Sequence, residues 1–281
     1  ENGGMHKGTV DIVRGASSYI RRASQKYCLL CGSYTLYSAV YDKMFEQHMD
    51  TGADITILYN VEQEPSSDIK FKDLRLATDE NGRVTDIQFK SANCAYNKVG
   101  MDMYLIKKDL LMYLLDDAAS HGKYDLVQDV IIGNLDKLKV YGYEHKGYVG
   151  RLTSVASYYK INMDFLKPEV QKELFYTGYP VYTKVKDHTP TKYEADCKVK
   201  NSIIGSGCVI EGEVENCVIF RDIHVAKGTS LKNCIVMQDS EIMENASLEH
   251  VILDKKVTVK PNTRLIGNPA YPVIIPKGAR I

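Results

Sequence analysis

The sequence predicts an α/β domain over residues 1–165, a linker over 166–196 and a parallel β-helix over 197–281. Three observations predict this order. Helix-like and strand-like stretches alternate in the first part, which is typical of a sheet covered by helices. Prolines and polar residues interrupt the periodicity of the linker. In the last part, short aliphatic segments recur at steps of 15, 17 and 17 residues.

The composition is that of a globular protein. Of the 281 residues, 44% are hydrophobic and 26% are charged. Lysine and arginine together number 36, and so do aspartate and glutamate. This balance gives no field that would attract nucleic acid or an anionic membrane surface, so neither is an expected partner. No apolar run approaches the roughly 18 residues of a membrane helix, and the start of the chain is unlike a signal peptide, so we expect a cytoplasmic protein.

The elements of the first domain follow from periodicity and turn residues. Helices are expected over 9–24 and 35–49, with a buried strand over 27–31 between them and a strand over 54–60 after them. Residues 71–78 and 83–89 flank Asp79-Glu80-Asn81-Gly82, where the Asn-Gly pair supplies positive φ angles for a hairpin. The remaining pattern predicts a strand over 99–106, helices over 108–120 and 126–132, a strand over 138–143 and a helix over 153–162.

The repeat places an aliphatic pair two residues after an asparagine or histidine. Its copies are Asn201-Ser202-Ile203-Ile204, Asn216-Cys217-Val218-Ile219, Asn233-Cys234-Ile235-Val236 and His250-Val251-Ile252-Leu253. The pattern resembles the hexapeptide repeat of left-handed parallel β-helices, in which three hexads form one coil, so about four coils are expected. Each coil buries its aliphatic residues against the next, and the two ends therefore need a cap or a partner.

The histidines of the repeat and the Cys28/Cys31 pair indicate structural roles rather than catalysis or metal binding. Hexapeptide β-helices also form the body of many acyltransferases, which use a histidine as the base. The candidate histidines here are His224 and His250, and neither has an obvious base-orienting neighbour in the sequence, which disfavours acyl transfer. Cys28 and Cys31 are predicted on one strand, where positions three apart point to opposite faces, which disfavours a metal site. The seven scattered cysteines are expected to be reduced and mostly buried.

Four segments resemble the sugar-phosphate nucleotidyltransferases, and ADP-glucose pyrophosphorylases in particular. They match the family's order and are Gly8-Thr9-Val10-Asp11-Ile12-Val13, Asp125-Leu126-Val127-Gln128-Asp129-Val130-Ile131, Gly147-Tyr148-Val149-Gly150-Arg151-Leu152 and the run from Tyr159 to Leu166. The resemblance implies a nucleotidyltransferase-like domain with a Rossmann-like mixed sheet. The family's glycine-rich phosphate loop has no counterpart, so the domain is expected to be incomplete at its N-terminus. Gly8, Thr9 and Asp11 would belong to the segment against the nucleotide base.

The departures from the family carry the functional prediction. In catalytic members two aspartates hold the Mg²⁺ ion that bridges the substrates, and their positions match Ser33 and Arg151 here. A serine is a poor Mg²⁺ ligand and an arginine cannot coordinate a cation. The family's sugar-phosphate motif is reduced to Lys90 between Phe89 and Ser91. The chain is therefore expected to bind no Mg²⁺ of its own and to be catalytically deficient.

This profile resembles the GlgD-type regulatory subunits of bacterial glucose-1-phosphate adenylyltransferase, which forms ADP-glucose and diphosphate from ATP and glucose 1-phosphate in glycogen biosynthesis. The resemblance implies a catalytic subunit as partner, with Mg²⁺ bound there, homo- and hetero-oligomers, and anionic metabolites as effectors. Two alternatives stay open. The chain could be an active nucleotidyltransferase with displaced metal ligands, or a free-standing sugar- or nucleotide-binding module.

Overall fold

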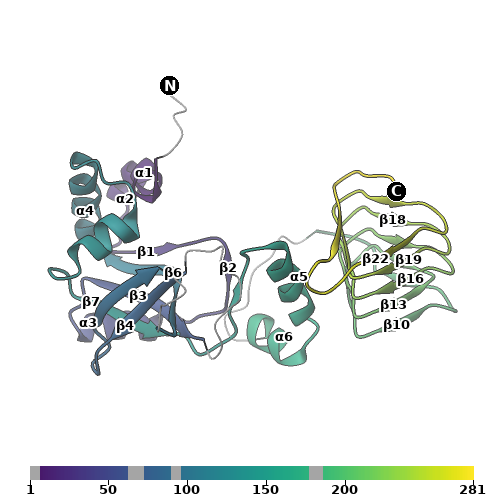
Figure 1. The fold of residues 1–281 in the computed structure, drawn as a ribbon, viewed down its shortest axis with the longest axis horizontal. Helices are drawn as coiled ribbons and strands as arrows, with labels where there is room; N and C mark the ends of the chain where they lie inside the picture. The colour runs from purple at the N-terminus through teal and green to yellow at the C-terminus, as the bar shows by residue number, and fades with distance from the viewer. Residues whose placement is uncertain (1–6, 63–72, 90–95, 177–185) are drawn as a thin grey trace. The chain divides into compact units, whose positions relative to one another are not determined.

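Figure 1 shows the computed structural model, which describes residues 7–62, 73–89, 96–176 and 186–281. The chain divides into two compact units. The first comprises residues 1–35 and 39–149, and the second comprises residues 36–38 and 150–281. Within the described ranges, no helix combines the length and the apolar character that a membrane span requires.

The first unit is built on a mixed six-stranded sheet in the order β5-β4-β6-β3-β7, with β1 paired to β6. Strands β3 and β7 are parallel and the other pairs are antiparallel. The strands are β1 (Tyr27–Cys31), β3 (Ile55–Val61), β4 (Leu74–Thr78), β5 (Val84–Phe89), β6 (Lys98–Lys107) and β7 (Val140–Glu144). The Rossmann-like mixed sheet expected from the sequence is confirmed.

The helices of this unit bury apolar side chains against the sheet. They are α1 (Thr9–Gly15), α2 (Ser17–Arg22), α3 (Asp42–Asp50), α4 (Lys108–Ser120), the π-helix η1 (Leu126–Ile131) and the 3₁₀ turn η2 (Ile132–Asn134). Leu111 and Leu115 of α4 are fully buried in one cluster with Ile55 and Ile57 of β3. The five buried residues that begin β3 are mostly β-branched, which suits a strand covered on both faces.

Three local expectations need correction. Residues 35–49 do not form one helix, because β2 (Thr35–Leu36) pairs with β8 (Gly150–Arg151) and α3 starts only at Asp42. The expected helix over 9–24 is broken at Ala16 into α1 and α2. The hairpin between β4 and β5 forms as expected, but of the Asn-Gly pair only Gly82 has a positive φ.

The second unit contains two helices and a three-sided parallel β-solenoid. Helix α5 (Val155–Asp164) begins with a capping box between Ser154 and Ser157. Helix α6 (Pro168–Phe175) lies within the expected linker, with its proline in the first turn, where a missing N–H costs nothing. Tyr159 of α5 packs on Ile235 and Ile252 of the solenoid.

Each side of the solenoid is a five-stranded parallel sheet, drawn as the green to yellow stack in Figure 1. The first sheet contains β9 (Lys192–Tyr193), β12 (Val209–Ile210), β15 (His224–Val225), β18 (Glu241–Ile242) and β21 (Thr258–Val259). The second contains β10 (Lys198–Lys200), β13 (Glu213–Glu215), β16 (Ser230–Lys232), β19 (Ser247–Glu249) and β22 (Arg264–Ile266). The third contains β11 (Ile203–Ile204), β14 (Val218–Ile219), β17 (Ile235–Val236), β20 (Val251–Leu253) and β23 (Val273–Ile275).

The repeat register is the one that the sequence predicts. Ile203 pairs with Val218, Val218 with Ile235, and Ile235 with Ile252. The residue two positions before each of these aliphatics has a positive φ, at Asn201, Asn216, Asn233 and His250. Asparagine tolerates this left-handed conformation better than most residues, which explains its recurrence at this corner.

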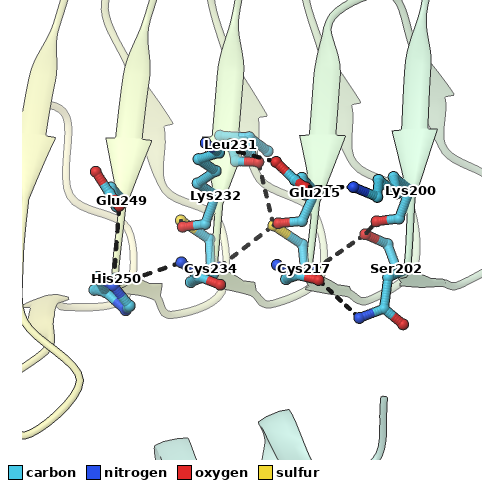
Figure 2. A network of polar contacts seen from close by, with 12 residues as sticks. Lys200, Ser202, Glu215, Cys217, Leu231, Lys232, Cys234, Glu249 and His250 are labelled. Carbon is cyan, nitrogen blue, oxygen red and sulfur yellow. Dashed lines mark hydrogen bonds and ion pairs between the residues drawn. The ribbon is translucent and has the colours of Figure 1, made fainter. Parts of the chain in front are cut away.

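Figure 2 shows a second ladder just inside that corner, built from Ser202, Cys217 and Cys234. The backbone N–H of Cys217 donates to the hydroxyl of Ser202 over 3.1 Å, and the N–H of Cys234 donates to the sulfur of Cys217 over 3.3 Å. Burial raises the pKa of the Cys234 thiol well above its usual range. The Cys234 thiol therefore stays neutral, and both cysteines are small, buried packing groups, as expected.

Candidate functional site

Two of the nucleotide-loop residues expected from the sequence, Gly8 and Thr9, pack on the segment that leads into η1. The Thr9 hydroxyl accepts a hydrogen bond from the backbone N–H of Leu126 over 2.7 Å, and the N–H of Val10 donates to the carbonyl of Tyr124 over 2.9 Å. A Cβ on Gly8 would lie 2.3 Å from that same carbonyl oxygen, so only glycine fits. The Thr9 hydroxyl makes no capping bond to its own helix and instead serves this neighbouring segment.

Carboxylates fix the geometry of that segment. Asp125 caps η1 by accepting the backbone N–H groups of Val127 and Gln128 over 2.9 and 2.8 Å. Asp129 accepts the N–H groups of Tyr124 and Asp125, and these bonds lower the pKa of Asp129. The third nucleotide-loop residue, Asp11, accepts the backbone N–H of Lys7 over 3.2 Å.

Ser33 is exposed and follows the end of β1, beside a carboxylate that sequence reasoning missed. The backbone N–H of Gly32 donates to the carbonyl of Asp102 in β6 over 2.8 Å. The Asp102 carboxylate lies directly over Gly32, because a Cβ there would be 2.0 Å from Oδ2 of Asp102. A negative charge therefore stands next to Ser33, but it comes from a different strand.

A β-bulge aims Asp102 at this position. Ile57 of β3 pairs with Tyr104, but Tyr59 pairs with Gly100, so residues 101–103 face the single residue Leu58. Asp102 has φ 52°, a left-handed conformation that is unusual for a non-glycine residue inside a strand. A lone acidic residue within the apolar run 99–106 was the only signal in the sequence.

The surroundings of Asp102 are acidic and rich in hydroxyl groups. Burial raises the pKa of Asp102, the nearby Asp125 adds to this, and a hydrogen bond from Tyr104 opposes it. Burial raises the pKa of Tyr104 well above its usual range, and the charges of Asp102, Tyr34 and Asp125 add to that increase. The phenol therefore stays protonated and can donate to the carboxylate.

Ser33 and Arg151, the two residues expected at the family's metal positions, offer no carboxylate to a Mg²⁺ ion. Ser33 offers one neutral hydroxyl, and Arg151 of β8, which belongs to the second unit, offers a positive charge. Over the parts of the chain that the structure describes, no three His, Cys, Asp or Glu side chains gather as a metal site. Lys90, the expected sugar-phosphate residue, lies outside the described residues.

The two candidate histidines of the solenoid have partners. His224 Nε2 lies 2.8 Å from Glu211 Oε1, so the expectation that it lacks an orienting neighbour was wrong. The hydroxyl of Tyr159 lies 2.7 Å from the carbonyl of Asn233 and 2.8 Å from Nδ1 of His250. Because the carbonyl can only accept, Tyr159 donates to it and accepts from His250, which fixes the Nδ1–H form of that ring. His250 thus holds α5 on the solenoid.

Comparison with known proteins places these features in context. Residues 187–270 match the family model described as "GlmU-like, C-terminal hexapeptide". The chain is 34% identical to the glycogen biosynthesis protein GlgD of Bacillus subtilis over 92% of this chain and 65% of that protein. It is 34% identical to GlgD of Geobacillus stearothermophilus over 75% of this chain and 50% of that protein.

The similarity extends to enzymes. The chain is 29% identical to the glucose-1-phosphate adenylyltransferase of Bacillus subtilis, over 80% of this chain and 60% of the enzyme. The chain thus spans between half and two thirds of the length of these curated relatives. The resemblance indicated by the sequence motifs is confirmed.

Proposed function

Because the chain is a relative of GlgD and of glucose-1-phosphate adenylyltransferase along most of its length, we propose that it is a regulatory part of that enzyme in glycogen biosynthesis. In this proposal a catalytic partner makes ADP-glucose from ATP and glucose 1-phosphate and holds the Mg²⁺ ion. This chain contributes a nucleotidyltransferase-like unit and a β-solenoid to the assembly and acts in the cytoplasm.

One observation supports this proposal above all others. The mixed sheet is kept, and the sequence motifs align Ser33 and Arg151 with the metal ligands of the family that the chain resembles. Nucleotidyl transfer needs the metal to neutralise charge on the phosphates, and neither residue offers a carboxylate. Each 1.36 kcal/mol of lost transition-state stabilisation lowers the rate about tenfold, so the loss of both ligands brings turnover close to background.

The solenoid supports a role in assembly. Its end strands β22 and β23 leave Ile266 and Ile274 about half exposed, at 53% and 50%. A coil stack buries its aliphatic residues only against neighbouring coils, so its ends are suited to contact another subunit. Anionic metabolites that act on the assembly would then change the kinetics of the catalytic partner.

The decisive experiment uses the purified protein, alone and mixed with the catalytic subunit of the same organism. Alone, it should form no detectable ADP-glucose with Mg²⁺, and the mixture should elute from a sizing column as a new, larger species. Effector dependence of the catalytic subunit should change in the mixture. Turnover by the isolated protein at the rate of a catalytic subunit would contradict the proposal, and so would a failure to associate.

Replacement of both positions provides the control. Ser33→Asp together with Arg151→Asp should recover a trace of activity at most, whereas either change alone should recover none, since metal ligands act as a unit. Full activity from one single replacement would show that the other position is not a metal site.

A further inference from the structure

We propose that Asp102 is a built-in anion that keeps phosphate groups away from the strand end at Gly32 and Ser33. The inference rests on the proposed function, because that function assigns this strand end to the place where catalytic relatives handle a metal and a triphosphate. It adds a cause of inactivity that is independent of the missing metal ligands.

The position of the carboxylate is built into the backbone. The bulge in β6 and the left-handed φ of Asp102 point its side chain at β1 rather than along the sheet. The backbone bond from Gly32 to the carbonyl of Asp102 joins the two strands at this point. The backbone thus sets the direction in which the carboxylate leaves β6.

The side chain is also fixed from both sides. The absence of a side chain at Gly32 leaves room for the carboxylate, since a Cβ there would lie 2.0 Å from Oδ2. Tyr104, which is only 4% exposed, approaches the carboxylate from the core, and its phenol lowers the pKa of Asp102. A charge held in this way is half-buried, where the solvent screens it less than it screens a surface charge.

No cation neutralises this charge among the described residues. The neighbouring groups that shift its pKa are Tyr104 and Asp125, and the second of these adds negative charge. Asp102 has no ion-pair partner in the described part of the chain. A phosphate placed beside Ser33 would therefore meet uncompensated negative charge without a metal ion to offset it.

The test removes the charge and keeps the shape. Asparagine has nearly the same volume as aspartate, tolerates a positive φ and keeps a side-chain oxygen that can accept a hydrogen bond, so Asp102→Asn isolates the electrostatic effect. Asp136→Asn, at an exposed aspartate of the same unit, is the matched control for net charge. Asp102→Gly serves as a second variant, because glycine accepts the left-handed backbone.

The probe is inorganic tripolyphosphate, with binding measured by equilibrium dialysis at low ionic strength in the absence and presence of Mg²⁺. Without metal, Asp102→Asn should bind at least about tenfold more tightly than the parent protein, and the difference should shrink as salt is added. Asp136→Asn should bind like the parent. Asp102→Gly should reproduce the gain, and circular dichroism should show all variants folded.

Two results would overturn the proposal. Equal binding by the parent and both Asp102 variants would show that the carboxylate has no electrostatic effect on phosphate binding. Weaker binding by Asp102→Asn only in the presence of Mg²⁺ would show that Asp102 holds a cation, as in a displaced metal site. Neither result bears on whether the chain assembles with a catalytic subunit, so the proposed function is tested separately.

Discussion

Gly32 lies against the Asp102 carboxylate, and the structure shows how closely an alanine methyl group at this position would approach that carboxylate. The new methyl group would lie 2.0 Å from Oδ2, 2.9 Å from Cγ and 3.1 Å from Cβ of Asp102. Overpacking of this kind costs about 1–3 kcal/mol. We therefore expect Gly32→Ala to destabilise the first unit by about 1–3 kcal/mol.

A double-mutant cycle checks the cause of this loss. Urea unfolding followed by far-ultraviolet circular dichroism, with amide exchange in β1 and β6 to report on the first unit, gives the free energy of unfolding of each variant. In an Asp102→Gly background the methyl group has free space, so the cost of Gly32→Ala should fall below about 1 kcal/mol. An equal cost in both backgrounds would refute the steric reasoning and place the strain in the backbone of Gly32.

Three further predictions concern other parts of the molecule. Burial lowers the pKa of His48, so the folded protein resists protonation of this imidazole. The neutral His48 should therefore contribute its full stability above about pH 6.5, and this contribution should be lost as the pH falls. His48→Gln should remove this pH dependence of the unfolding free energy. Tyr159→Phe removes both the hydrogen bond to the Asn233 carbonyl and the acceptor for His250, so it should destabilise the packing of α5 by about 1–3 kcal/mol. Limited proteolysis at that helix should become faster. An unchanged cleavage rate would argue that apolar packing alone holds α5. Gly8→Ala would place a methyl group 2.3 Å from the Tyr124 carbonyl, so it should lower thermal stability by several degrees in calorimetry, and a neutral effect would mean that the segment before α1 can move.

The solenoid could be predicted because its signal is local and repeated. Each coil repeats the same kind of corner residue and aliphatic pair: Asn216 precedes Val218 in one coil, and Asn233 precedes Ile235 in the next. Misplacing one coil would break its register with both neighbours. The family motifs also placed Gly8 and Thr9 in one segment, and the structure shows what that segment contacts.

The first unit was harder because distant partners decide its elements. The expected helix over 35–49 loses its first residues to β2, whose partner β8 lies more than a hundred residues later in the chain. The bulge at Asp102 depends on the register between β3 and β6, and no property of residues 99–106 alone fixes that register. No sequence motif therefore predicted that a carboxylate from another strand lies beside Ser33.

The corner residues of the solenoid have a consequence for how its length can change. Corners with positive φ recur in coil after coil, supplied by residues such as Asn216, Asp222, Gly228 and Asn245. Each coil thus carries its own turns and depends on its neighbours only for burial. Duplication or loss of one whole coil would keep every remaining pairing in register, whereas a gain or loss of one residue within a strand would turn its aliphatic side chains outward. The domain is therefore free to grow or shrink in whole coils, and selection should tolerate length variation here only in those steps.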